Sequence, residues 1–403
     1  MRTGKAQAPG AAGPGGSRCV DSFSRLPPAF PTVCLVDLPS VTPPYDHALA
    51  TALAGAGANV ELVAGAPVHG TAASGPAYRT VALSGGGARG RVGRAWKLAR
   101  LPAVMATVGR HARRADVVHY QWLGLEELAA RLLPRKRPRV MTAHDVVPRE
   151  PRRGQRAAFG RLARAMDAVV VHSEYGAERL RGELGVPAER IRVIPHGAFT
   201  HLAELRDERP LPAELAAVDQ PVVLFFGFLS RYKGVDILLD ALERLEGVEA
   251  WIAGVPRVDM ADLRARAARA AATVRFMPRF LDDAELPALF RRADVVVLPY
   301  REIDQSGVLH TALAFGRPMV VTRVGGLAEV ADRHGAAVAV PPGDTHALAA
   351  ALERLVRDPE ELERLARRAA QAARGEYSWG RIARMHLELY GELAGRDYDL
   401  PSP

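Results

Sequence analysis

The segment PVVLFFGFLSRYKGVDILLDALERL (221–245) indicates the fold class most clearly. It begins with an apolar run of strand length, passes through a loop that starts at a glycine, and ends in an amphipathic helical pattern. Further apolar strand segments follow it at 249–255, 272–280, 293–300, 317–326 and 336–344. Short strands that alternate with helical segments predict a parallel sheet with helices on both faces.

The same alternation occurs earlier in the chain. We expect a helix at 46–58 and strands at 32–38, 58–65, 77–83, 115–122, 138–147, 166–174 and 190–197. The prediction is therefore an α/β protein with two doubly wound, Rossmann-like parallel-sheet domains that face each other across a cleft. Its expected parts are a disordered leader (1–30), an N-terminal domain (31–200), a linker (201–220), a C-terminal domain (221–375), and a C-terminal helix with a tail (376–403).

Composition limits the class of protein. The chain has 403 residues and a formal net charge of +9, and few of its basic residues are lysines, so a lysine at a motif position is informative. Only two cysteines, Cys19 and Cys34, argue against a disulfide scaffold or a multi-cysteine metal site. No apolar run reaches the roughly 18 residues of a membrane span, and the leader lacks a signal peptide's apolar centre. We expect a cytoplasmic protein.

The loop GFLSRYKGVD (227–236) has the features of an anion site. A glycine ends the strand, Arg231 and Lys233 follow, and Gly234 opens a helix. Backbone N–H groups at a helix start and a nearby cation suit a diphosphate. The alternative is a solvated loop with ordinary surface cations.

A second candidate anion site follows the strand at 293–300. Ser306 is positioned to cap a helix at about 308–315, and the amides of residues 306–309 would form a cradle at its N-terminus. The alternative is a well-capped connection of the kind that any doubly wound fold contains. Two such cradles after strands of the same half favour a phosphate-containing ligand.

These segments resemble those of the retaining glycosyltransferases of family 4, which have the two-domain GT-B fold. FFGFLSRYKGVDILLDAL is similar to the strand–Gly–loop–Lys-Gly–helix segment of that family, and QSGVLHTALAFGRPMVVTRVGGLAEV is similar to its donor-binding segment. Shorter pieces fall in the expected order: TAHDVVP (142–148), HSEYGAERL (172–180), IPHGAF (194–199) and YSW (377–379). The resemblance covers most of residues 32–395.

The resemblance implies catalytic roles for three residues. His144 would reach the donor sugar from across the cleft, and Lys233, helped by Arg231, would contact the donor diphosphate. The segment around Met277–Phe280 would line the nucleobase, and the helix around Trp379 would cross back onto the N-terminal domain. The implied donor-binding residues are Gly227, Phe228, Arg279, Asp304, Gln305, Ser306, Gly307, Val308, Leu309 and Thr311.

The family pattern is changed at three positions. Its glutamate pair, spaced eight residues apart, aligns with Ile303 and Thr311, and Thr311 offers the donor ribose only a weaker hydrogen bond. Its arginine after the strand-end glycine is Phe228 here, and Arg231 could supply that charge. A branch of the family carries this form, so we interpret the changes as variation.

Candidate acceptor contacts lie in the loop PSVTPPYDH (39–47), at Tyr45, Asp46 and His47. The alternative is a proline-stiffened turn in which Asp46 caps the next helix. GGGARG (85–90) matches the letters GxGxxG, but it does not follow the first strand and no acidic residue lies about 20 positions on, so a mobile loop is favoured.

A basic stretch at 89–114 combines eight Arg and Lys with Trp96, Leu98, Leu101, Met105 and Val108, and 131–139 adds further charge. Such a segment can lie on an anionic membrane surface, at the inner face of the cell membrane. The alternative is a solvated helix in an arginine-rich protein. No reader motif accompanies the charge, so nucleic acid is not an expected partner.

Five isolated features carry weaker expectations. His119 is expected in the core, whereas His172 and His196 are weak candidates at strand ends near the cleft. Glu329 is expected to cap or charge the helix after the Gly-Gly turn. The DYD letters at 397–399 lie in the tail and not after a strand, so no metal is predicted.

The combined prediction is a retaining glycosyltransferase that moves a hexose-type sugar from a nucleotide diphosphate sugar to a hydroxyl acceptor, which could be lipid-linked. The resemblance implies front-face attack with the leaving phosphate as base, without a dedicated nucleophile or cofactor. The alternatives are a partner subunit without turnover, suggested by the missing glutamates, and an epimerase of nucleotide sugars with the GT-B fold. Base, sugar and acceptor stay undetermined.

Overall fold

The computed structural model describes residues 30–67, 75–83, 90–123, 132–134, 137–147 and 153–398. Residues 1–29 of the predicted leader, residues 85–89 of the glycine-rich loop and Asp399 lie outside these ranges.

The first domain is built on a seven-stranded parallel sheet in the order β3-β2-β1-β4-β5-β6-β7. Its order reverses between β1 and β4, which is the position where open α/β sheets bind ligands beyond the strand ends. The apolar pattern of the inner strands is buried from both faces, as a sheet between two helix layers requires, whereas the edge strands β3 and β7 are partly exposed. The strands are β1 (Thr32–Asp37), β2 (Asn59–Ala64), β3 (Arg79–Ala82), β4 (Val117–Trp122), β5 (Arg139–Thr142), β6 (Ala168–Val171) and β7 (Ile191–Val193).

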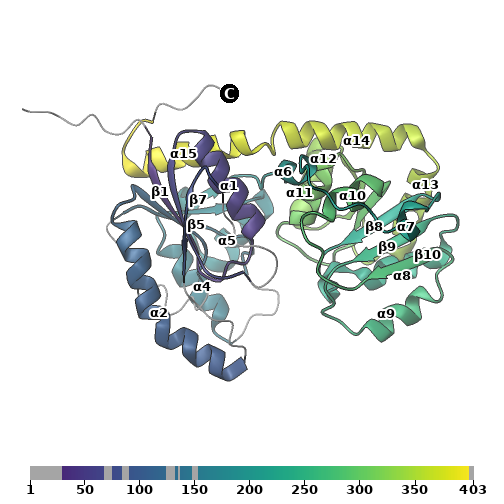
Figure 1. Cartoon of the computed structure of the whole chain (residues 1–403), viewed down its shortest axis with the longest axis horizontal. Coiled ribbons are helices and arrows are strands. Elements are labelled where there is room, and N and C mark those ends of the chain that lie inside the picture. Colours follow the sequence, from purple (N-terminus) through teal and green to yellow (C-terminus); the bar gives the residue numbers. More distant parts are fainter. Residues whose placement is uncertain are drawn as a thin grey trace, which may run out of the picture.

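The second domain has a six-stranded parallel sheet in the order β10-β9-β8-β11-β12-β13, with its own reversal between β8 and β11. The two sheets confirm the predicted pair of doubly wound domains, which lie side by side in Figure 1. The strands are β8 (Val222–Phe226), β9 (Glu249–Ala253), β10 (Thr273–Met277), β11 (Val295–Leu298), β12 (Met319–Thr322) and β13 (Ala337–Val340).

Helices cover both sheets. In the first domain they are α1 (Pro43–Gly55), α2 (Gly90–Ala112), α4 (Gln155–Arg164) and α5 (Glu174–Leu184). The second domain has α8 (Val235–Ala241), α9 (Met260–Ala267), α10 (Leu286–Arg292), α11 (Gly307–Ala314), α12 (Gly325–His334), α13 (Thr345–Val356) and α14 (Pro359–Arg374). Between the domains, the expected linker contains the single-turn helices α6 (Thr200–Ala203) and α7 (Ala213–Ala216).

Helix α1 begins three residues earlier than the expected start at residue 46. Two prolines, Pro43 and Pro44, occupy its first turn, where a residue without an N–H is tolerated. Asp46 therefore lies inside the helix and does not cap it, which corrects the alternative interpretation of this loop.

The C-terminal helix α15 (Trp379–Ala394) leaves the second domain and packs against α1 of the first (Figure 1). Its apolar face, which includes Leu387 and Tyr390, joins the same buried cluster as Leu49 of α1. His119 of β4 is fully buried there, 2.6 Å from the hydroxyl of Tyr390 through Nδ1 and 2.8 Å from that of Thr142 through Nε2. The prediction that His119 is a satisfied core residue is confirmed.

The basic helix α2 does not keep its apolar face free. Leu101, Met105 and Val108 are buried in the core of the first domain, which corrects the expectation that they face a membrane. Trp96 and Leu98 fall outside the described side chains. None of the helices in the described ranges combines the length and the hydropathy that crossing a bilayer requires.

Candidate functional site

A cavity of about 450 Å³ opens between the two domains, at the strand ends next to both sheet reversals. Val41, Thr42 and Trp122 come from the first reversal, and Gly227 and Tyr300 from the second. The volume lies within the range of small-ligand sites. The expected donor-binding residues that line it are Gly227, Phe228, Lys233, Arg279, Gln305, Ser306, Gly307, Val308 and Thr311.

Lys233 brings a buried cation to this cavity. The side chain is only 8% exposed, and its ammonium lies 5.2 Å from the centre of the Tyr300 ring. A Cβ atom built on Gly227 would lie 2.5 Å from Lys233 Nζ and 3.4 Å from a methyl of Val308, and the φ angle of +108° at Gly227 also favours glycine. The end of β8, the ammonium and the start of α11 therefore meet at one point.

Helix α11 presents its N-terminus to the same point. Ser306 caps the helix by accepting a hydrogen bond from the Leu309 amide, as predicted, which leaves the first-turn amides of Gly307 and Val308 at the cavity. Gln305 covers one further amide, since its side-chain oxygen accepts from Ser306 N–H at 2.8 Å. Thr311 donates its hydroxyl hydrogen to the carbonyl of Gly307, so this proton is already used within the helix.

Three residues that the resemblance assigned to the donor do not line the cavity. Arg231 is exposed beside it, and its backbone carbonyl accepts from Arg301 Nη1 and from the Gly234 amide. Leu309 is buried in the core. Asp304 is also buried, and its carboxylate points into the first domain. Lys233 is thus the cation that the 227–236 loop contributes to this cavity.

Two exposed phenylalanine rings and an arginine that is paired with a glutamate lie at the opening of the cavity. Phe228 is 39% and Phe280 42% exposed, and the guanidinium of Arg257 lies 4.8 Å from the centre of the Phe228 ring. Arg279 lines the cavity but binds Glu285 through both terminal nitrogens, at 2.9 and 2.6 Å. Its charge is therefore largely neutralised by Glu285.

The first domain contributes three histidines from strand ends: His144, His172 and His196. His144 lies flat on Trp122, with ring centres 5.3 Å apart. Burial, reinforced by neighbouring imidazoles, lowers the pKa values of His144 and His196 well below the ordinary value. Burial also lowers the pKa of His172 to about 4, so all three rings are neutral near pH 7.

Their hydrogen bonds determine which nitrogen carries the proton. His172 Nδ1 lies 2.9 Å from the carbonyl of Ile194, which can only accept, so Nδ1 holds the hydrogen and Nε2 is an acceptor. His144 Nε2 lies 3.0 Å from Gln121 Oε1, which can only accept, so His144 carries its hydrogen on Nε2 and donates to Gln121. His144 Nδ1 then faces His172 Nε2 at 3.3 Å as a second acceptor, so this contact is not a hydrogen bond. The sequence suggested His172 only weakly, although its ring lies directly beside that of His144.

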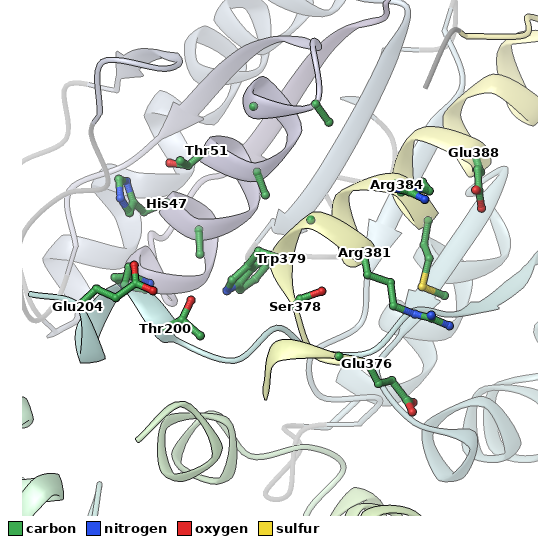
Figure 2. Close-up of a pocket in the computed structure, with 18 residues that line it drawn as sticks. His47, Thr51, Thr200, Glu204, Glu376, Ser378, Trp379, Arg381, Arg384 and Glu388 are labelled. Carbon is green, nitrogen blue, oxygen red and sulfur yellow. The ribbon is translucent and has the colours of Figure 1, made fainter. Parts of the chain in front are cut away.

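The three candidate acceptor residues separate in the structure. Tyr45 lines the cavity and touches His144 and Trp379, with ring centres 4.7 and 5.3 Å apart. His47 lies on another cavity, of about 1080 Å³, between α1, α6 and the start of α15, where Figure 2 places it across from Trp379. Asp46 is fully buried and lines neither cavity.

Asp46 instead forms a buried acid pair with Asp37 at the end of β1. Neither oxygen of Asp46 meets a donor group among the described residues, and a proton held between Asp46 and Asp37 would give one of these oxygens a partner. Burial, with the nearby charge of Asp37, raises the pKa of Asp46 well above its usual value, and burial also raises that of Asp37. Asp37 Oδ2 additionally accepts from the Val41 amide, so the pair supports the loop that lines the cavity.

Trp379 connects the segment between α14 and α15 to the site. Its ring lies directly on Gly197, where a Cβ would come within 2.3 Å of the indole, and the Ala198 amide donates to the carbonyl of Tyr377 at 2.8 Å. The two segments that pass between the domains, one after β7 and one before α15, are thereby held together behind Tyr45. Two facing Rossmann-like domains with an anion cradle between them define the class: this is the GT-B fold of the glycosyltransferases.

Comparison with known proteins identifies the family. The profile described as Glycosyl transferases group 1 matches residues 220–358, and that described as Glycosyltransferase Family 4 matches 45–201. Glycogen synthase of Mycobacterium tuberculosis is 30% identical over 293 residues, which cover 69% of each chain. The chain therefore belongs to the group 1 glycosyltransferases of family 4, as the resemblance predicted, and it is a glycosyltransferase.

Further relatives differ in what their names say they transfer. The alpha-D-kanosaminyltransferase of Streptomyces kanamyceticus is 28% identical over 242 residues, covering 56% of this chain and 60% of that protein. Among solved structures, sucrose-phosphate synthase of Thermosynechococcus elongatus superposes with a TM-score of 0.72 at 22% identity, covering 90% and 99% of the two chains. Anabaena HepE, solved with UDP and glucose, gives 0.70 at 19%, covering 90% and 100%. These two superpositions confirm the fold.

Proposed function

We propose that this protein transfers a sugar from a nucleoside diphosphate sugar to a hydroxyl acceptor with retention of anomeric configuration. The observation that carries the proposal is the meeting of the buried Lys233 ammonium with the first-turn amides of Gly307 and Val308 at one cavity. A buried cation and a helix N-terminus both favour a group that gathers negative charge, which a departing diphosphate does.

The reaction proceeds in one active-site step. The bond between the anomeric carbon and the diphosphate oxygen breaks, and the acceptor oxygen bonds to that carbon on the same face. The acceptor proton passes to the leaving phosphate oxygen. Asp145 is the one carboxylate among the described residues that line the cavity, and the proposal assigns it no covalent role.

The remaining cavity residues position the two substrates. Neutral His144 lines the cavity against Trp122, where its ring would contact the donor sugar. Exposed Phe228 and Phe280 at the mouth offer faces to the nucleoside. By their names, one relative synthesises glycogen and another transfers kanosamine. We infer from them that this protein acts in the synthesis of a polysaccharide or of a glycosylated metabolite.

A thermal-shift screen against UDP-, GDP-, ADP- and dTDP-sugars tests the donor. A ligand at about 100 times its Kd stabilises the native state by about 2.7 kcal/mol, and Lys233→Met should abolish the response. The anomeric configuration of the product, read by NMR after incubation with the responding donor and hydroxyl acceptors, tests retention. Inversion, or turnover that disappears in Asp145→Asn with the fold intact, would contradict front-face transfer.

The same incubations separate the alternatives. Transfer or slow donor hydrolysis by the isolated chain excludes a partner subunit without turnover. A changed sugar configuration in the donor itself, without acceptor, would identify an epimerase.

A further inference from the structure

Asp304 lies at a junction between the two domains. It precedes the Ser306 cap by two residues, and both of its carboxylate oxygens are bound by the first domain. The Val146 amide donates to Oδ2 at 2.9 Å, and Arg179 Nη1 donates to Oδ1 at 2.5 Å. With 5% of its surface exposed, this carboxylate has exchanged water for two donors from across the cleft.

Its partner Arg179 is itself held in place. Glu183 binds the other side of the guanidinium, accepting from Nε at 2.7 Å and from Nη2 at 3.3 Å. Partial burial disfavours the charge, but the hydrogen bonds that Arg179 donates to Glu183 and Asp304 outweigh it and raise the pKa of Arg179. The guanidinium is therefore a permanent and oriented cation of α5.

The backbone of Asp304 is engaged as well. Its carbonyl accepts from the Gly326 amide at 3.2 Å and from the Ser173 hydroxyl at 3.4 Å. The side-chain and backbone contacts of Asp304 together fix the position of the loop before α11 relative to the first domain.

The junction connects the two halves of the reaction site. Val146 comes two residues after His144, and Ser306 comes two residues after Asp304. A path from the histidine that faces the sugar to the cap of the diphosphate cradle therefore runs through this hydrogen-bonded carboxylate. A second contact runs beside it, since Gln305 donates to the His172 carbonyl at 3.4 Å and accepts from the Ser306 amide.

We propose that Asp304, bound by Arg179 and the Val146 amide, is a positioning residue that aligns the amides of Gly307 and Val308 with His144, so that the diphosphate cradle is fully formed only when the two domains are in contact. This inference rests on the proposed function for its kinetic readout. The contacts of Asp304 are present without substrate, so their effect on the loop can also be measured in the substrate-free protein.

A neighbouring contact offers the matched control. Glu329 of α12 also crosses between the domains, where it accepts from the amides of Glu174 and Tyr175 at 3.1 and 2.8 Å. It accepts from the first-turn amides of α5 in the first domain, whose N-cap is Ser173, whereas the sequence suggested that it caps or charges its own helix. Glu329→Ala removes an interdomain contact and leaves the loop at residues 303–306 with all of its partners.

The test compares Asp304→Asn, Arg179→Met, their double variant and Glu329→Ala in the full chain. Each loss of a charge-assisted contact should raise the KM for the donor, and the Kd for the free nucleoside diphosphate, about tenfold or more. The double variant should be no worse than the more severe single variant, because both changes act on the same carboxylate. Glu329→Ala should leave both constants within about twofold, with the KM for the acceptor unchanged in all four.

Hydrogen exchange of the substrate-free proteins gives the second readout. The amides of residues 303–309 should lose protection in Asp304→Asn and Arg179→Met and keep it in Glu329→Ala. Unchanged protection in the first two, additive effects in the double variant, or equal effects of Glu329→Ala would each overturn the inference. A wild type that binds no nucleoside diphosphate would count against the proposed function, while the exchange result would still decide the role of Asp304.

Discussion

Replacing Gly227 by alanine should weaken donor binding while the fold of the cleft is kept. The new Cβ would lie 2.5 Å from Lys233 Nζ, so the ammonium must move by about 1 Å to reach an ordinary contact. The atom in its way is the far end of a flexible side chain, so the fold can accommodate the change. The φ angle of +108° adds backbone strain of about 1–3 kcal/mol for a residue with a Cβ.

We expect Gly227→Ala to weaken donor binding more than its backbone strain alone would. An ammonium displaced from the diphosphate forfeits a charge-assisted hydrogen bond, about 1.5–3 kcal/mol, which corresponds to a KM for the donor about 10- to 150-fold higher. Strain alone would lower the melting temperature of the second domain and leave the KM of the folded enzyme unchanged.

The assay is a double-variant cycle of Gly227→Ala and Lys233→Met, with the KM for the donor and the melting temperature measured for each protein. If Gly227→Ala acts by moving the ammonium, it should add little to the KM for the donor in the Lys233→Met background. Gly247→Ala is the control for backbone strain, because Gly247 has a φ angle of +71° and no atom lies within 4 Å of the position that its Cβ would occupy.

Two results would refute the reasoning. Gly227→Ala could weaken donor binding by the same factor with and without the ammonium, which would place its effect elsewhere. Lys233→Met could leave the KM for the donor within about twofold, which would remove Lys233 from the diphosphate site.

Three further changes have defined outcomes. Ser306→Ala removes a helix cap and should lower the free energy of unfolding by about 1 kcal/mol, measured in urea, with a modest rise in the KM for the donor; an unchanged urea midpoint would contradict the cap. The raised pKa values of Asp37 and Asp46 mean that the native state binds the extra proton, so wild-type stability should fall as pH rises from about 4. Asp46→Asn should flatten that dependence, and an equal slope in both proteins would disprove the shared proton. Gly197→Ala would bring a Cβ to 2.3 Å from the rigid indole of Trp379, and should cost about 1–3 kcal/mol and loosen α15 to protease; an unchanged melting temperature would show that the ring moves freely.

Much of the fold could be predicted from local pattern. Each apolar run of strand length became a strand that begins within two residues of the expected start, because burial in a parallel sheet imposes that pattern. Half of these strands end three to five residues earlier than expected, since the loop that follows the strand begins within the predicted range. The start of α1 was missed by three residues, since two prolines in its first turn look like a loop in the sequence. The apolar positions of α2 were identified, but the pattern could not tell a domain core from a membrane surface.

The candidate site divides in the same way. Lys233 and the cap at Ser306 depend on short-range spacing after a strand, and both lie where that spacing placed them. Arg231, only two positions from Lys233, points away from the cavity, because a single-turn 3-10 helix (Arg231–Lys233) turns the two side chains in different directions.

The sequence by itself determined that this is a two-domain α/β glycosyltransferase with a cation and a helix N-terminus at the donor site. These are properties of contiguous segments, in which strand length, caps and glycines act within a few residues of one another. Only the tertiary structure decided the partners of Asp304, which lie 125 and 158 positions away, and the helix that Glu329 caps, 155 positions away. A buried carboxylate binds whichever donors the packed domains bring to it, and that choice is made by the arrangement of the two sheets and not by its neighbours in the chain.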